Sequence, residues 1–191
     1  MGESTGRGIG RRIAAYGASA DPRTALANFV ALLVASSQPV YPLYLYWTVS
    51  ETIWPSLVTF LSMPFFLAVP ALARRHDRAG RALMVLAGIG NTILCAKAFG
   101  VASGVEMFLV PCALLALVLF RPSERWTAWP LAALALGPYL LLHERYGAPL
   151  HLYSPEEYAA FARLNFMSAA SVVVLVGYRL TALLGEGEGP G

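Results

Sequence analysis

The residues of this chain that could do chemistry lie within long apolar stretches or at their ends. The three histidines, His76, His143 and His151, are far apart in the sequence, and only generic carboxylates stand near the last two. A zinc site needs three or four ligands at compatible spacing. No hydrolase, metalloprotease or phosphate-loop motif is present. We therefore expect no enzymatic activity, no bound metal and no cofactor.

The two cysteines have two interpretations. Cys95 and Cys112 lie at similar distances from a turn near Ser103, so a helical hairpin would bring them to similar depth. A disulfide has strict geometric requirements that equal depth does not meet by itself. Buried free thiols are ordinary packing residues. We expect free thiols, and the sequence leaves open whether the two approach each other.

Polar side chains inside the apolar stretches carry a stronger signal, because each costs a few kcal/mol unless it faces a bundle interior or water. Lys97 and Glu106 flank a short turn, close enough for an ion pair. They pair with each other, or Lys97 snorkels outward, or one of them anchors a polar ligand. Asn91 and Asn165 could bond across helices, for packing or for binding.

Aromatic residues gather at the same end of these stretches. Tyr41 lies one to two turns inside the expected interface, between Pro39 and Pro42, and prolines bend helices and open space between them. The sequence predicts an outward-facing pocket, whereas an aromatic belt with ordinary packing is the alternative. The expected ligand-binding residues are Tyr41, Tyr44, Trp54, Asn91, Lys97, Glu106, Tyr139 and Asn165.

The composition indicates where these residues are held. Of the 191 residues, 57% are hydrophobic and 13% are charged, and soluble domains are about 25% charged. So few charges cannot cover the surface of a soluble enzyme of this length. The net charge of +3 comes from scattered basic residues, which argues against nucleic acid as a partner. The expected environment is the lipid bilayer.

Six stretches are apolar and long enough to be membrane spans, which need about 20 helical residues. We predict an all-α, polytopic membrane protein with a six-helix domain over residues 21–184, between disordered segments at 1–20 and 185–191. The predicted spans are 24–47, 51–73, 82–102, 105–120, 126–143 and 155–183. Asp21 before Pro22, and Ser154 three residues before Glu157, are typical helix N-caps.

The basic residues indicate the orientation. Six spans would place eleven Lys and Arg on one side and three on the other, so both termini should be cytoplasmic. The eleven are Arg7, Arg11, Arg12, Arg23, Arg74, Arg75, Arg78, Arg81, Arg121, Arg125 and Arg179, and the three are Lys97, Arg145 and Arg163.

Residues 100–126, GVASGVEMFLVPCALLALVLFRPSERW, have a recognisable pattern. A turn of small residues is followed by a short span with an internal proline and by a basic Arg-Pro-Ser-Glu-Arg loop. This pattern resembles the six-helix membrane sensor domain of bacterial class III adenylate cyclases. It is also similar to the corresponding domain of the α-hydroxyketone-sensing histidine kinases. Asn91, preceded by Gly88 and Gly90, fits both.

The resemblance implies a receptor. Our leading interpretation is a protein of the bacterial inner membrane that binds a small apolar or weakly polar ligand from the outer-leaflet side. Its sixth helix would pass a movement to a cytoplasmic output domain, in a dimer. The sequence given has no such domain after Arg179, so we expect a separate cytoplasmic cyclase or histidine kinase partner, or a remnant with a structural role. The alternative function is a small transporter or channel subunit. The proline, glycine and buried polar residues of the chain favour a transporter or channel. Against it, no inverted repeat and no acidic residue at mid-membrane are evident.

Overall fold

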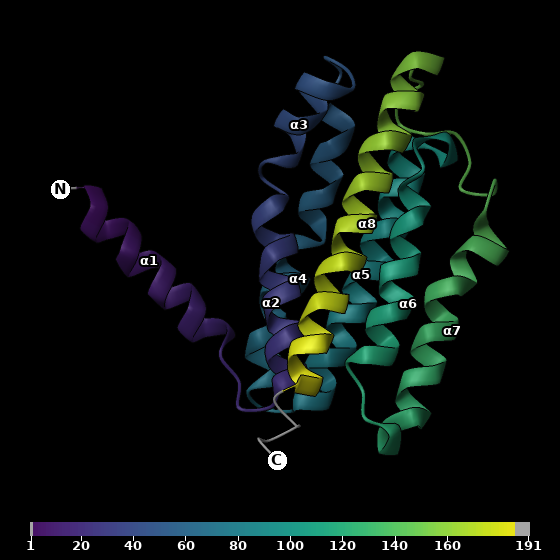
Figure 1. The fold of residues 1–191 in the computed structure, drawn as a ribbon. Helices are drawn as coiled ribbons and strands as arrows, with labels where there is room; N and C mark the ends of the chain where they lie inside the picture. The colour runs from purple at the N-terminus through teal and green to yellow at the C-terminus, as the bar shows by residue number, and fades with distance from the viewer. Residues whose placement is uncertain (1, 186–191) are drawn as a thin grey trace.

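The computed structural model describes residues 2–185, with side chains described for residues 10–181, and over that range it has helices and no strand. Most helices stand side by side in a bundle, from which α1 leads away (Figure 1). The elements are α1 (Gly2–Gly17), α2 (Pro22–Ser37), α3 (Tyr41–Thr48), η1 (Trp54–Leu61), α4 (Met63–Ala73), α5 (Asp77–Phe99), η2 (Val101–Ser103), η3 (Val105–Phe108), α6 (Leu109–Val118), η4 (Pro122–Glu124), α7 (Arg125–Leu142) and α8 (Pro155–Gly185).

Prolines interrupt the first two predicted spans. The first consists of α2 and α3, which meet at 55° across residues 38–40. The second begins as the 3₁₀-helix η1 and continues as α4, and each of these helices has a proline in its first turn. A proline cannot donate the backbone hydrogen bond of a continuous helix. The first segment is therefore a broken helix, whereas η1 and α4 together form one helical stretch, Trp54–Ala73.

The segments that follow turn sharply. Gly104 has φ 70°, a backbone conformation that favours glycine, and it ends the short turn between α5 and η3. The segment Val105–Val118 then meets Pro122–Leu142 at 111°. Helices α6 and α7 pack against each other side by side (Figure 1).

Within the described residues, three helices are long and apolar enough to cross a membrane alone: Trp54–Ala73, Asp77–Phe99 and Pro155–Thr181. The number rises to as many as five if each bent pair forms one span. The all-helical, membrane-type character of the predicted fold is confirmed, while the number of six spans and the orientation of the termini stay predictions.

The helix starts agree with the sequence where capping is local. The side chain of Asp21 accepts hydrogen bonds from the backbone of Arg23 and Thr24. Ser154 and Glu157 bond each other's backbone N–H groups, as a capping box requires. The N-terminal segment differs, because α1 forms a helix where disorder was expected. Of the tail at 185–191, only Gly185 lies within the described residues, at the end of α8.

A group of charges, some buried and some exposed, joins the starts of several helices at one end of the bundle. Glu124 accepts from Arg81 and from Arg78, each at 2.9 Å, and Arg121 pairs with Asp21 at 2.7 Å. We call these five residues the basal ionic cluster. It links α2, α5 and the α6–α7 corner, at the end of the bundle where α8 also finishes (Figure 1).

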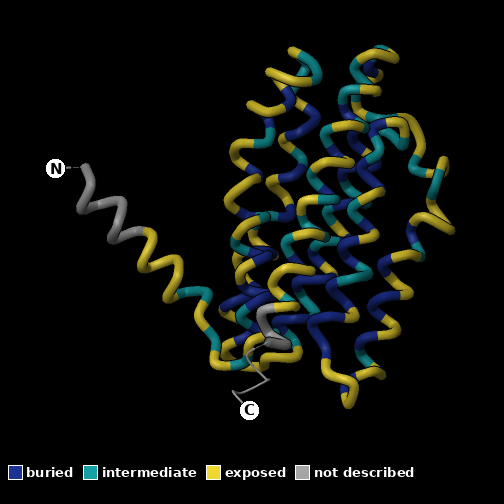
Figure 2. The backbone as a smooth tube through the Cα atoms, in the orientation of Figure 1, coloured by how far each residue is buried: buried dark blue, intermediate teal, exposed yellow. Residues whose placement is uncertain are grey.

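The core beside this cluster includes a row of small residues on α2. Ala27, Ala31 and Ala35 recur every four residues on α2 and are at most 1% exposed. Small residues at this spacing let helices in a membrane approach closely. Figure 2 shows that buried backbone concentrates in the middle of the bundle and exposed backbone on its outside.

Candidate functional site

A cavity of about 430 Å³ lies inside the bundle, between α2, α3, α5, α6 and α8. Its walls are mainly apolar, and both cysteines, Cys95 and Cys112, are free thiols that line it. The prediction of free thiols is thus confirmed. A volume of this size is within the range of small-molecule sites. We refer to it as the interior cavity.

Gln38 brings an incompletely bonded polar group to this cavity. Gln38 is 4% exposed, and its Nε2 donates to Ser62 Oγ at 2.7 Å. Its Oε1 is buried and has no hydrogen-bond partner within the described residues. Buried polar atoms are nearly always bonded, so an exception needs an explanation. A ligand that donates a hydrogen bond would supply the missing partner.

Ser62 and Asn91 continue this polar group toward the outside of the bundle. Ser62 Oγ lies 2.7 Å from Asn91 Oδ1 and 2.7 Å from the carbonyl oxygen of Thr59. A hydroxyl has one hydrogen, so Ser62 donates to only one of these oxygens at a time. We call Gln38, Ser62 and Asn91 the polar trio. Within it, the Ser62 hydroxyl can donate either to Asn91 or to the Thr59 carbonyl oxygen.

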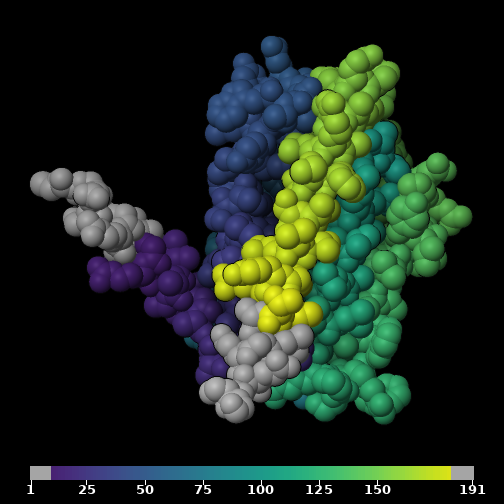
Figure 3. Space-filling model, in the orientation of Figure 1, coloured from purple at the N-terminus to yellow at the C-terminus, as the bar shows by residue number. Residues whose placement is uncertain are grey.

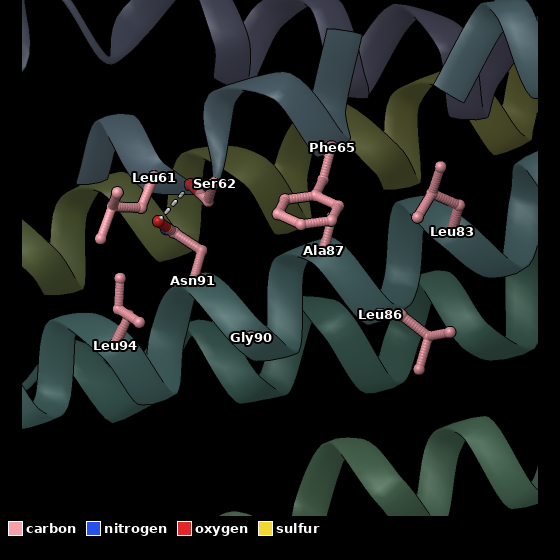
Figure 4. A pocket seen from close by; sticks show the side chains of 9 residues that line it. All are labelled: Leu61, Ser62, Phe65, Leu83, Leu86, Ala87, Gly90, Asn91 and Leu94. Carbon is pink, nitrogen blue, oxygen red and sulfur yellow. Dashed lines mark hydrogen bonds between the residues drawn. The ribbon is translucent and has the colours of Figure 1, made fainter. Parts of the chain in front are cut away.

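Ser62 and Asn91 of this trio also border a second cavity, of about 400 Å³, between the η1–α4 segment and α5. Figure 4 shows Ser62 and Asn91 facing each other across it, with Phe65, Leu83 and Leu86 farther along its walls. We call this cavity the lateral groove. Asn91 lines both the lateral groove and the interior cavity.

Helix α8 closes another side of the interior cavity, with Leu164, Ser168 and Val172 among its lining residues. The helix lies across the front of the bundle in Figure 3. Asn165 is 1% exposed, and its Nδ2 donates to the Ser103 carbonyl oxygen at 2.8 Å. This bond anchors the upper part of α8 to η2.

A separate polar group lies at the other end of the bundle from the basal ionic cluster. Glu106 is 6% exposed; its Oε2 lies 2.6 Å from His143 Nδ1, and its Oε1 accepts from the Tyr146 hydroxyl at 3.0 Å. Burial, and then the bond to the Glu106 carboxyl, raise the pKa of Tyr146 well above its ordinary value. The Tyr146 phenol therefore stays protonated and donates. We call these three residues the outer carboxyl cluster.

The predicted Lys97–Glu106 ion pair is wrong. Lys97 Nζ instead donates to the Ala148 carbonyl oxygen at 2.7 Å. The loop after α7 brings both partners, since it supplies His143 and Tyr146 to Glu106 as well as the carbonyl to Lys97. The Lys97 side chain therefore holds this loop and does not line the interior cavity.

The eight residues predicted to bind ligand separate into two groups. Tyr41, Tyr44, Asn91 and Asn165 line the interior cavity. The other four do not: Trp54 is 52% exposed at the start of η1, Tyr139 stacks on His143 with ring centroids 4.7 Å apart, and Lys97 and Glu106 bond the outer loop.

Gln38 and Ser62 are cavity residues that the site prediction missed. A glutamine within an apolar stretch was a usable signal, because such a residue is costly unless it faces the interior. Ser62 gave no such signal, since a serine bonds its own helix easily. Among the side chains described, those of residues 10–181, no three His, Cys, Asp or Glu come close enough to hold a metal ion.

One comparison with known proteins gives a match. The MASE7 family model covers residues 14–184, from the last turn of α1 to the last turn of α8. No curated protein and no solved structure matches the chain. The match includes every residue of the interior cavity, the lateral groove and the outer carboxyl cluster.

Proposed function

Because the chain belongs to the MASE7 family of membrane-associated sensor domains, we propose that it binds a small molecule in the interior cavity and reports its presence through α8. One observation carries the proposal: Gln38, which lines a mainly apolar cavity, has a buried acceptor, Oε1, with no partner within the described residues. A sensor needs such an unfilled interaction, because only a ligand that bonds one state better than another shifts an equilibrium.

The lining favours an apolar or weakly polar ligand. Aromatic rings of Tyr41 and Tyr44 and the side chains of Leu164 and Val172 supply contact area, while Gln38 supplies an acceptor. Few, well-placed polar groups in an apolar wall are typical of sites that select small molecules. We expect the ligand to come from the outer-leaflet side, because the proposed orientation would put the tyrosines of α3 there.

Helix α8 is the proposed output element. It lines the interior cavity along one face, and only 22% of its most apolar segment is buried inside the bundle. A helix with so few contacts can shift at low cost when the cavity fills. Its far end lies at the end of the bundle where α2 starts (Figure 1). There it would meet a cytoplasmic cyclase or histidine kinase partner, in a dimer, and the chain itself would catalyse no reaction.

We propose six spans in the bacterial inner membrane with both termini in the cytoplasm. Two observations support this: α6 and α7 pack side by side, as separate spans do, and α2 starts at the end of the bundle where α8 finishes (Figure 1). The arginines of the basal ionic cluster gather at that end, as the positive-inside rule favours for a cytoplasmic face. Reporter fusions after Arg179 and after Ala148 test the orientation, since the first should report cytoplasm and the second periplasm. The reverse would contradict it.

A thermal-shift screen in lipid nanodiscs tests binding, with single-chain alcohols, hydroxyketones and monoacylglycerols as ligands. A ligand that binds only the folded state raises the Tm. Ser37 lines the interior cavity and Ser36 does not, although both hydroxyls bond the carbonyl three residues back at 2.8 Å. At least one compound should raise the Tm of wild type and of Ser36→Phe but not of Ser37→Phe. Equal shifts in all three proteins would exclude this cavity.

A further inference from the structure

We infer that the ligand enters the interior cavity sideways, from the hydrocarbon of the bilayer through the lateral groove, and that it is a single-chain amphiphile with an uncharged, hydrogen-bond-donating head group. The inference rests on the proposed function and adds an entry route, a gate and a ligand class. It starts from the observation that Asn91 lines both cavities.

The lateral groove opens toward lipid. Its two walls belong to Trp54–Ala73 and Asp77–Phe99, which are two of the three helices able to span a membrane by themselves. Leu61 and Phe65 at its edge are 65% and 57% exposed. A Cβ added at Gly90 would meet nothing within 4 Å, so this glycine leaves the groove open. A hydrocarbon chain would fit along these walls (Figure 4).

The polar trio separates the groove from the interior. Ser62 lines the groove and Gln38 lines the interior cavity, and the two are bonded to each other. The bond between Ser62 and Asn91 closes the passage between the η1–α4 segment and α5. This bond can break cheaply, because the Ser62 hydroxyl then donates to the Thr59 carbonyl oxygen, also at 2.7 Å. The Ser62–Asn91 bond therefore acts as a gate, and when it opens the Ser62 hydroxyl still has the Thr59 carbonyl oxygen as its acceptor.

The chemistry of the two linings defines the ligand. Neither lining includes a charged side chain among the described residues, and burying an unpaired charge is very costly. The head group is therefore uncharged. It donates a hydrogen bond, because the atom that waits for a partner, Gln38 Oε1, only accepts. An alkyl chain fills the apolar groove behind the head, as in a long-chain alcohol or a monoacylglycerol.

Photolabelling in phosphatidylcholine nanodiscs tests the route, with a long-chain primary alcohol that carries a diazirine near its hydroxyl. The readout is insertion into Cys112 and Leu115 of α6, mapped by peptide mass spectrometry. Both line only the interior cavity and are at most 7% exposed, so bulk lipid does not reach them. Wild type should be labelled there. Gly90→Leu fills the groove and should lower labelling about tenfold, and Ser62→Ala opens the gate and should raise it.

Gly137→Leu is the matched control. Gly137 lies in α7, a Cβ added there also meets nothing within 4 Å, and it lines neither cavity. Labelling of this variant should equal that of wild type. Equal labelling of Gly90→Leu and wild type would overturn the lateral route. A Gly90→Leu variant that changes the oligomeric state and not the labelling would overturn it too, since the groove would then hold a second copy of the chain.

The two proposals fail in distinguishable ways. If α6 of wild type is not labelled but another compound raises the Tm of wild type and not of Ser37→Phe, the lateral route is wrong and the proposed function stands. If α6 is not labelled and no compound discriminates the Ser37→Phe variant, the proposed function fails as well.

Discussion

Gln38 and Ser62, which are 24 residues apart in the sequence, are joined by a 2.7 Å hydrogen bond from Nε2 to Oγ in the buried middle of the bundle. The bond uses one end of the Gln38 amide and leaves Oε1 buried without a partner in the described part of the chain. Because such an atom costs about 1–3 kcal/mol, the bundle carries a local defect that a ligand would relieve. The site and the proposed function both follow from this pair.

The outer carboxyl cluster should behave as an energetically coupled unit. Glu106→Gln and Tyr146→Phe each remove part of a hydrogen bond between the same two groups. We predict that the double variant loses about 1 kcal/mol less than the two single losses together, as contacting residues do. Unfolding in detergent by circular dichroism measures the four free energies. Simple additivity would show that the Tyr146 hydroxyl does not contribute through Glu106.

The same tyrosine should give the protein an alkaline pH dependence. Its pKa is raised in the folded state, mainly by burial and then by Glu106, above the ordinary value of 10.0. The folded state then holds the proton more tightly than the unfolded state, so this stabilisation is complete below pH 10 and is lost as the pH rises further. The free energy of unfolding of Tyr146→Phe should fall less steeply above pH 10 than that of wild type. Parallel curves would contradict the assignment.

The basal ionic cluster should depend on Glu124 far more than on Arg78. Arg81 is 3% exposed and loses its carboxylate partner in Glu124→Gln, which we expect to cost about 3–5 kcal/mol because a buried charge is left uncompensated. The side chain of Arg78 is 64% exposed, so Arg78→Gln should cost at most about 1 kcal/mol. Chemical unfolding of both variants measures this difference. Similar losses would mean that Arg81 does not rely on Glu124.

Two glycines of α5 should respond oppositely to alanine. A Cβ at Gly80 would lie 2.5 Å from that of Ala73, where α4 and α5 touch, whereas a Cβ at Gly90 meets nothing within 4 Å. Gly80→Ala should therefore destabilise the protein by about 1–3 kcal/mol. Gly90→Ala should stabilise it by up to about 1 kcal/mol through helix propensity alone. A change in the Tm of the same sign for both variants would refute the close approach at Gly80.

The sequence allowed correct predictions wherever an interaction is local. The Asp21 cap and the Ser154–Glu157 capping box span two or three residues, so their partners can be read directly from the sequence. The all-helical, membrane-type fold follows from apolar length in the same way. Proline positions also indicated bent spans, although not that α2 and α3 would meet at 55°.

The site could be predicted only in part, because its partners are distant in the sequence. Glu106 bonds residues 37 and 40 positions away, and nothing near Lys97 indicated that Ala148 would return to it. Trp54 and Tyr139 were placed by depth along the membrane. Depth gives no rotation about the helix axis, and both side chains point away from the interior cavity.

The most direct test of ligand binding in the interior cavity is native mass spectrometry of the protein released from nanodiscs with the best compound of the thermal-shift screen. Ser168 lines the cavity from α8, and Ala170 on the same helix does not. We predict one bound ligand per chain for wild type and for Ala170→Phe, and none for Ser168→Phe. One ligand per chain on all three proteins would contradict binding in the interior cavity.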